Sequence, residues 1–185
     1  MVNKKKTAGR TLAVLGAAAL GLTGLASVAS AADLEPGNIV GTEKGSLTIF
    51  KYDGLPTGQA NDGQELTTAP NLDTLEGVTF TIQQLGLDDG NGCEAIDLTT
   101  NAGWDVVDQV NDGSLTFGDF CVVGGEGGEK AAKTDKDGKI EFKGLDLGLY
   151  YVTETGAGEN NIVQPTAPFF VTIPMPTLKD PGAES

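Results

Sequence analysis

Apolar and polar residues alternate along much of this chain, with the two-residue period of β-strands that bury one face. In residues 78–83 the apolar side chains alternate with Thr and Gln, and in residues 139–143 Ile and Phe alternate with Lys and Glu. Residues 169–173 show the same pattern, whereas residues 149–155 are aromatic and β-branched on both faces. The pattern predicts several short strands, one of them buried on both faces.

Turn-forming residues separate these segments. The sequences at 135–138 and 144–148 are typical of turns that lead into strands, and the Gly-rich run at 124–128 is typical of a loop. Residues 59–71 form a long polar insertion, and residues 104–110 are compatible with a short helix. These features predict an all-β protein, an immunoglobulin-like β-sandwich with at most one short helix.

The amino-terminal segment is typical of a secretory signal peptide. Four basic residues precede the Ala-, Leu- and Gly-rich stretch at 11–28, and Ala29-Ser30-Ala31 is a small-residue cleavage site. A membrane anchor is the alternative, but the apolar run is short and rich in Gly. We expect a signal peptide at 1–31, a flexible leader at 32–45, one sandwich domain at 46–174 and a tail at 175–185.

The charge of the chain excludes several functions. The full sequence has 26 acids, 12 bases and no His, for a net charge of −14. Removal of residues 1–31 would leave eight bases and a net charge of −18. Without His there is no imidazole base and no His-bound zinc. An acidic chain repels phosphate, so we expect no nucleic-acid partner, and the mature form should have no membrane partner.

The two cysteines of an exported chain are expected to meet an oxidising environment. Cys93 and Cys121 would then pair, closing a loop of 27 intervening residues. Loop entropy assigns such a bond about 3–4 kcal/mol. Two free thiols, or pairing with another chain, are the alternatives.

The Asp-rich segments resemble turns rather than metal sites. An EF-hand that began at Asp135 would need a ligand at its fifth position and Gly at its sixth, but Lys139 and Ile140 stand there. Residues 88–92 are equally well explained as a turn. No spacing singles out a catalytic carboxylate pair, so we expect no metal, no cofactor and no enzymatic activity.

Two charged residues lie in apolar patterns. Lys51 falls on the same strand face as Leu47 and Ile49, and Glu154 shares a face with Tyr150 and Val152. A buried charge is costly unless it is paired, so the pattern suggests an interior Lys51–Glu154 pair. The alternative is that Lys51 lies at the solvent end of its strand.

The same residues carry a family resemblance. Residues 45–54, 75–82, 134–155 and 168–175 resemble the Cna B-type, SpaA-like domain, an immunoglobulin-like sandwich of Gram-positive surface proteins. Residues 96–104 are similar to a stretch of major pilin subunits. Together with the leader, these segments resemble the N-terminal domain of a sortase-assembled shaft pilin.

The resemblance implies a site. In this family a Lys on the first strand can form an isopeptide bond with an Asn, and a Glu promotes the reaction. Lys51 matches the position of that Lys, and Glu154 matches the position of that Glu. This sequence departs from the pattern, because no Asn lies in 169–174 and neither a Tyr-Pro-Lys-Asn motif nor an LPxTG-type signal precedes Ser185. We therefore expect a truncated module that lacks its final strand, with Lys51 unreacted and paired with Glu154.

The resemblance also implies a function. It predicts a structural subunit of a covalently polymerised pilus for surface attachment, secreted and displayed at the cell wall. Its partners would be other pilin subunits, a sortase and a host receptor or glycan. A secreted host- or glycan-binding adhesin is the main alternative, which the scarcity of Trp and Tyr weakens, and a hydrolase is a third.

Overall fold

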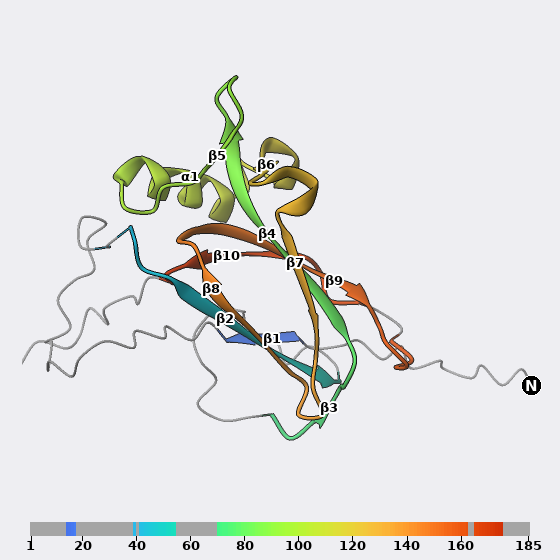
Figure 1. Ribbon diagram of the computed structural model, residues 1–185. Coiled ribbons are helices and arrows are strands. Elements are labelled where there is room, and N and C mark those ends of the chain that lie inside the picture. The colour runs from blue at the N-terminus through green and yellow to red at the C-terminus, as the bar shows by residue number, and fades with distance from the viewer. Residues whose placement is uncertain (1–13, 18–38, 40, 55–69, 163–164, 176–185) are drawn as a thin grey trace, which may run out of the picture.

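The computed structural model describes residues 14–17, 39, 41–54, 70–162 and 165–175, which form two antiparallel sheets and one α-helix (Figure 1). The predicted sandwich with one short helix is therefore confirmed. Most of the expected leader, most of the polar insertion and most of the tail lie outside the described residues. The strands are β1 (Val14–Ala17), β2 (Gly45–Asp53), β3 (Asp73–Thr74), β4 (Thr79–Asp88), β5 (Cys93–Ala95), β6 (Cys121–Val122), β7 (Glu129–Lys133), β8 (Lys139–Leu145), β9 (Gly148–Gly156) and β10 (Phe169–Ile173).

The first sheet is built around β2. This strand pairs with β8, in a register that places Leu47 opposite Phe142 and Ile49 opposite Ile140. It also pairs with β3 near its end and with β1, which comes from the segment predicted to be a signal peptide.

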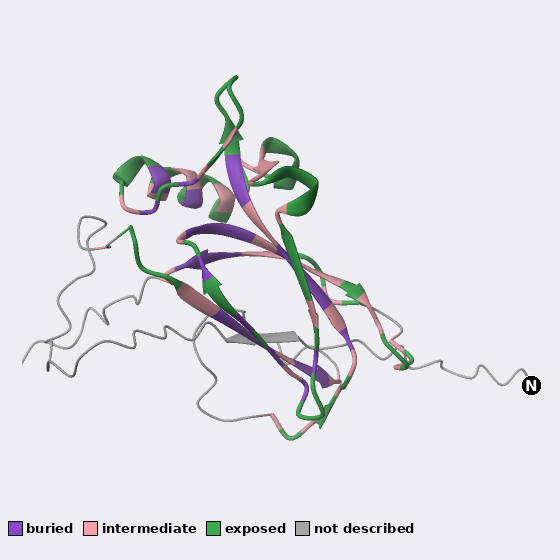
Figure 2. Cartoon of the chain, in the orientation of Figure 1, coloured by how far each residue is buried: buried purple, intermediate pink, exposed green. Residues whose placement is uncertain are grey.

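The second sheet is built around β4, which pairs with β9, β7, β5 and β6. Strand β10 pairs with β9, with Val171 opposite Tyr150. Both sheets present their inward residues to one core, and the buried segments of β2, β4, β8, β9 and β10 are purple in Figure 2. The core consists of Leu47, Ile49, Val78, Phe80, Ile82, Ile140, Phe142, Leu145, Tyr150, Val152, Val171 and Ile173.

A second core lies on the other face of the β4–β9–β10 sheet, beneath helix α1 (Asn101–Asn111). Leu85 of β4 and Leu149 of β9 pack there with Val107 of the helix. In β9, Leu149 faces this second core while Tyr150 and Val152 face the first. The prediction that β9 is buried on both faces is therefore confirmed.

Helix α1 is longer than the sequence suggested, because it begins at Asn101 rather than at Trp104. Thr100 is its N-cap, and the Thr100 hydroxyl accepts a hydrogen bond from the Gly103 amide at 3.2 Å. The indole of Trp104 donates to the carbonyl of Leu98 at 2.8 Å, which ties the helix to the segment before it.

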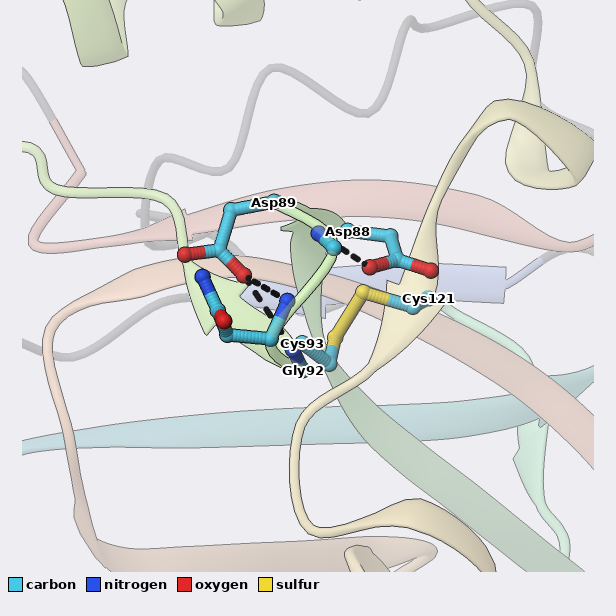
Figure 3. The surroundings of a disulfide bond; sticks show 7 residues. Asp88, Asp89, Gly92, Cys93 and Cys121 are labelled. Carbon is cyan, nitrogen blue, oxygen red and sulfur yellow. Dashed lines mark hydrogen bonds between the residues drawn. A yellow bond between two sulfur atoms is a disulfide. The ribbon is translucent and has the colours of Figure 1, made fainter.

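The Asp-rich segments are turns, as predicted. Asp135 accepts hydrogen bonds from the amides of Asp137 and Lys139, both at 2.9 Å. Asp89 accepts from the amides of Asn91 and Gly92, as Figure 3 shows beside the disulfide. Because these carboxylates bind backbone amides of their own loops, the spacing of the Asp residues serves turn formation.

The disulfide joins the two strands that flank the end of β4. Cys93 of β5 and Cys121 of β6 are bonded, with Cα atoms 5.8 Å apart, and this is the pairing expected from the sequence (Figure 3). Gly86 of β4 pairs with Ala95 on one side and with Cys121 on the other. A Cβ at Gly86 would lie 2.8 Å from the Cys93 Sγ and 2.2 Å from the Glu94 carbonyl oxygen. Residue 86 must therefore lack a side chain for the strand and the disulfide to fit together.

We predict that Gly86→Ala destabilises the domain by about 1–3 kcal/mol, the usual cost of forcing an extra carbon into a packed site. Urea denaturation of the oxidised protein measures this loss. Gly118→Ala is the matched control, because the nearest atom to a Cβ there is the Thr116 hydroxyl oxygen at 3.9 Å. Equal stability of the two variants would show that the disulfide does not constrain Gly86.

Candidate functional site

Lys51 lies on β2 with its side chain directed into the space between the sheets. Its exposed fraction is 0%, and it lies on the same face of β2 as the buried Leu47 and Ile49. The backbone of Lys51 is held at both polar atoms, because its amide donates to the Gly138 carbonyl at 2.8 Å and its carbonyl accepts from the Leu75 amide at 3.0 Å. Gly138 has a φ of +69°, and a Cβ there would lie 2.5 Å from the Lys51 carbonyl oxygen. The glycine of the Asp-rich turn thus lets that turn pack against Lys51.

Glu154 approaches the same point from the opposite sheet. It lies on β9, its side chain is 2% exposed, and its Oε2 is 2.8 Å from the Lys51 Nζ. The sequence left open whether Lys51 is paired inside the domain or sits at the solvent end of its strand. The structure brings the two predicted residues together as a buried ion pair that links the two sheets. We call Lys51 and Glu154 the inter-sheet ion pair.

A third residue, Thr166, completes the site. It belongs to the irregular segment between β9 and β10. Its amide and its hydroxyl both donate to the Glu154 Oε2, at 2.8 and 2.6 Å, and its hydroxyl accepts from the Lys51 Nζ at 2.9 Å. The sequence analysis missed Thr166, because no periodicity marks a residue in an irregular segment.

Burial and charge have opposite effects on Lys51. Desolvation is the larger, and it lowers the pKa of the Lys51 amine below its ordinary value. The hydrogen bond to Glu154 and the charges of Glu154 and Asp53 act in the other direction. Such a shift favours the neutral, nucleophilic amine, which is why buried lysines are candidates for covalent chemistry.

The partners of Lys51 determine what the site can do in this arrangement. The hydrogen bonds that the structure gives its Nζ end on a carboxylate and a hydroxyl, neither of which is an amide carbonyl. Asn160 precedes Thr166 in the segment between β9 and β10. Its side-chain amide donates instead to the carbonyls of Glu76 and Ala157. The described geometry is that of an ion pair supported by a hydroxyl group.

The aromatic residues considered for ligand binding are largely engaged in packing. Tyr150 is buried and donates to the Asp146 carbonyl at 2.8 Å, and burial raises the pKa of its hydroxyl. Tyr151 stacks on Phe117 with ring centroids 4.2 Å apart. Among the described residues, no group of three His, Cys, Asp or Glu side chains could hold a metal ion. Within the same residues no helix is long and apolar enough to cross a membrane.

Known proteins resemble this chain over most of its length. A curated relative, the fimbrial subunit type 2 of Actinomyces naeslundii, is 34% identical over 183 residues, which cover 90% of this chain and 32% of the relative. The full-length major pilin SpaD of Corynebacterium diphtheriae has a similar structure, with a TM-score of 0.51 and 28% identity over 78% of this chain and 30% of that one. The fimbrial protein FimP of Actinomyces oris matches more weakly, with a TM-score of 0.40 and 26% identity over 62% of this chain and 22% of that one.

The chain therefore spans about a third of the length of the fimbrial relative and of SpaD. The family model that describes the N-terminal domain of Gram-positive pilin subunits, called D1, matches residues 43–180. This match includes the helix, the disulfide and all three residues of the site. It also includes every described strand other than β1. The chain belongs to the Gram-positive pilin D1 N-terminal domain family.

Proposed function

We propose that this chain is the N-terminal structural module of a Gram-positive pilus shaft subunit. The observation that carries the proposal is the D1 family match across strands β2 to β10, together with the fold shared with a major pilin. In this proposal the chain is the substrate of an assembly enzyme, a sortase, and is not itself an enzyme. Its partners are other pilin subunits, and the product is a fibre held at the cell wall that attaches the cell to a host receptor or glycan.

The inter-sheet ion pair has a structural role in this proposal. A shaft module has to keep its two sheets in one arrangement, and the pair links β2 of one sheet to β9 of the other. We further propose that Lys51 stays unreacted in the chain as it stands. The carboxylate of Glu154 and the hydroxyl of Thr166 beside its amine support this, since neither offers the amide that an isopeptide bond consumes.

Polymerisation tests the proposed function directly. In cell-wall extracts of the bacterium that makes this protein, an antibody against residues 43–175 should detect a ladder of bands that survives boiling in SDS, because covalently joined subunits do not separate. Deletion of the sortase should reduce the ladder to one monomer band. A monomer band alone in the sortase-positive strain would contradict the pilus function.

Intact-mass measurement tests the state of Lys51. For a purified polypeptide of residues 32–185, the mass should equal that calculated from its sequence, less the two hydrogens of the Cys93–Cys121 bond, with no ammonia lost. Lys51→Met, which cannot form an isopeptide bond, serves as the control. An ammonia deficit present in the original protein and absent in this variant would show that Lys51 had reacted.

Denaturation tests the contribution of the pair to stability. We expect Lys51→Met to lower the free energy of unfolding by about 3–5 kcal/mol, because it leaves a buried carboxylate without a cation. The double variant Lys51→Met with Glu154→Leu should recover most of the loss, since no buried charge remains. Lys143→Met, which breaks an exposed pair with Glu141, should cost less than about 1 kcal/mol. Equal losses in Lys51→Met and Lys143→Met would contradict the role of the inter-sheet ion pair.

A further inference from the structure

Thr166 makes a closed triangle of hydrogen bonds with the inter-sheet ion pair. Lys51 Nζ donates to Glu154 Oε2 at 2.8 Å and to the Thr166 hydroxyl oxygen at 2.9 Å. The Thr166 hydroxyl in turn donates to the same Glu154 oxygen at 2.6 Å. A hydroxyl has one proton to give, so donation to the carboxylate leaves its lone pairs to accept from the ammonium.

The bonds of Thr166 hold both members of the pair in place. Thr166 donates its amide and its hydroxyl to the Glu154 carboxylate, which fixes that carboxylate beside Lys51. The Lys51 ammonium gains an acceptor in the hydroxyl oxygen. Thr166 thus opposes, at the Lys51 amine, the desolvation that lowers the pKa of that amine.

The position of Thr166 also matters. It lies twelve positions after Glu154, between the end of β9 and the start of β10. Because its backbone amide is one of the donors, the two bonds to Glu154 hold the segment before β10 against the pair. The charged groups that act on the Lys51 amine among the described residues are Glu154 from β9 and Asp53 from β2.

We propose that Thr166 is a positioning residue that holds the Lys51 amine against Glu154 and favours its ammonium form. It opposes the effect of burial on the Lys51 amine and so makes that amine less available as a nucleophile. The inference rests on the proposed function and deepens it, because it concerns the ion pair that links the two sheets of the proposed shaft module.

Titration of Lys51 tests the role of Thr166. The ammonium of a buried lysine can be followed by NMR in protein labelled with ¹⁵N-lysine, and the pH at which the Lys51 signal is lost reports its pKa. Thr166→Val removes the hydroxyl and keeps the shape and the backbone amide. We expect this pH to fall by about one unit, since a hydrogen bond to a charged group contributes about 1.5 kcal/mol and one pKa unit corresponds to about 1.4 kcal/mol.

Two further variants separate positioning from general stability. Thr166→Ser keeps the hydroxyl and should titrate like the original protein. Thr155→Val is the matched control, because Thr155 follows Glu154 on β9 and its hydroxyl bonds to that of Thr81 at 2.9 Å. It should leave the Lys51 titration unchanged. An unchanged titration in Thr166→Val, or an equal shift in Thr155→Val, would overturn the proposal.

The original protein offers a test that needs no folded variant. The Thr166 hydroxyl proton should exchange slowly and show a nuclear Overhauser effect to the Lys51 ammonium; absence of this contact would also overturn the proposal. These measurements use the purified chain and do not depend on fibre assembly. A missing SDS-resistant ladder with a shifted Thr166→Val titration would therefore refute the pilus function and leave the role of Thr166 intact.

Discussion

The buried contact between Lys51 and Glu154 is the constraint on which the arrangement of the two sheets depends. Removing an ammonium or a carboxylate from water costs several kcal/mol, and neither charge can leave the interior without breaking the strand that carries it. A shift of β2 by one residue would turn Lys51 to the outer face and leave Glu154 without its cation. The pair therefore specifies one register of β2. It also specifies which face of each sheet packs against the other, in addition to any stability that it contributes.

The rest of the domain can be understood from the two faces of the second sheet. Strand β9 directs Tyr150, Val152 and Glu154 towards the first sheet, and directs Leu149 and Tyr151 towards helix α1. A sheet covered on both faces needs a second layer, which the segment between β5 and β6 supplies. The Cys93–Cys121 bond ties the two ends of that segment to either side of β4, so that the helix stays over its core.

Sequence reasoning found the strands, the disulfide and two residues of the site because each follows a local rule. Period-two alternation placed Lys51 and Glu154 on apolar faces. The expected export of the chain to an oxidising environment favoured a bond between its two cysteines. It could not decide between a buried and a solvent-end position for Lys51, since that depends on what covers the strand. It also missed Thr166 and the start of α1 at Asn101, although Thr100 before the helix was a readable N-cap. Thr166 approaches the pair only through the path of an irregular segment, which no periodicity predicts.

The difference between a crosslink and an ion pair depends on what stands next to the amine. Formation of an amide from Lys51 would require a neutral nitrogen and an acyl carbon that can lose its leaving group. A carboxylate that already accepts three hydrogen bonds on one oxygen is a poor acyl donor, and a hydroxyl has no acyl carbon at all. Burial lowers the pKa of Lys51 and favours its neutral, reactive form, whereas the hydrogen bond and the charge of Glu154 act in the other direction. Lys51 and Glu154 thus form an electrostatic link between the two sheets of this domain.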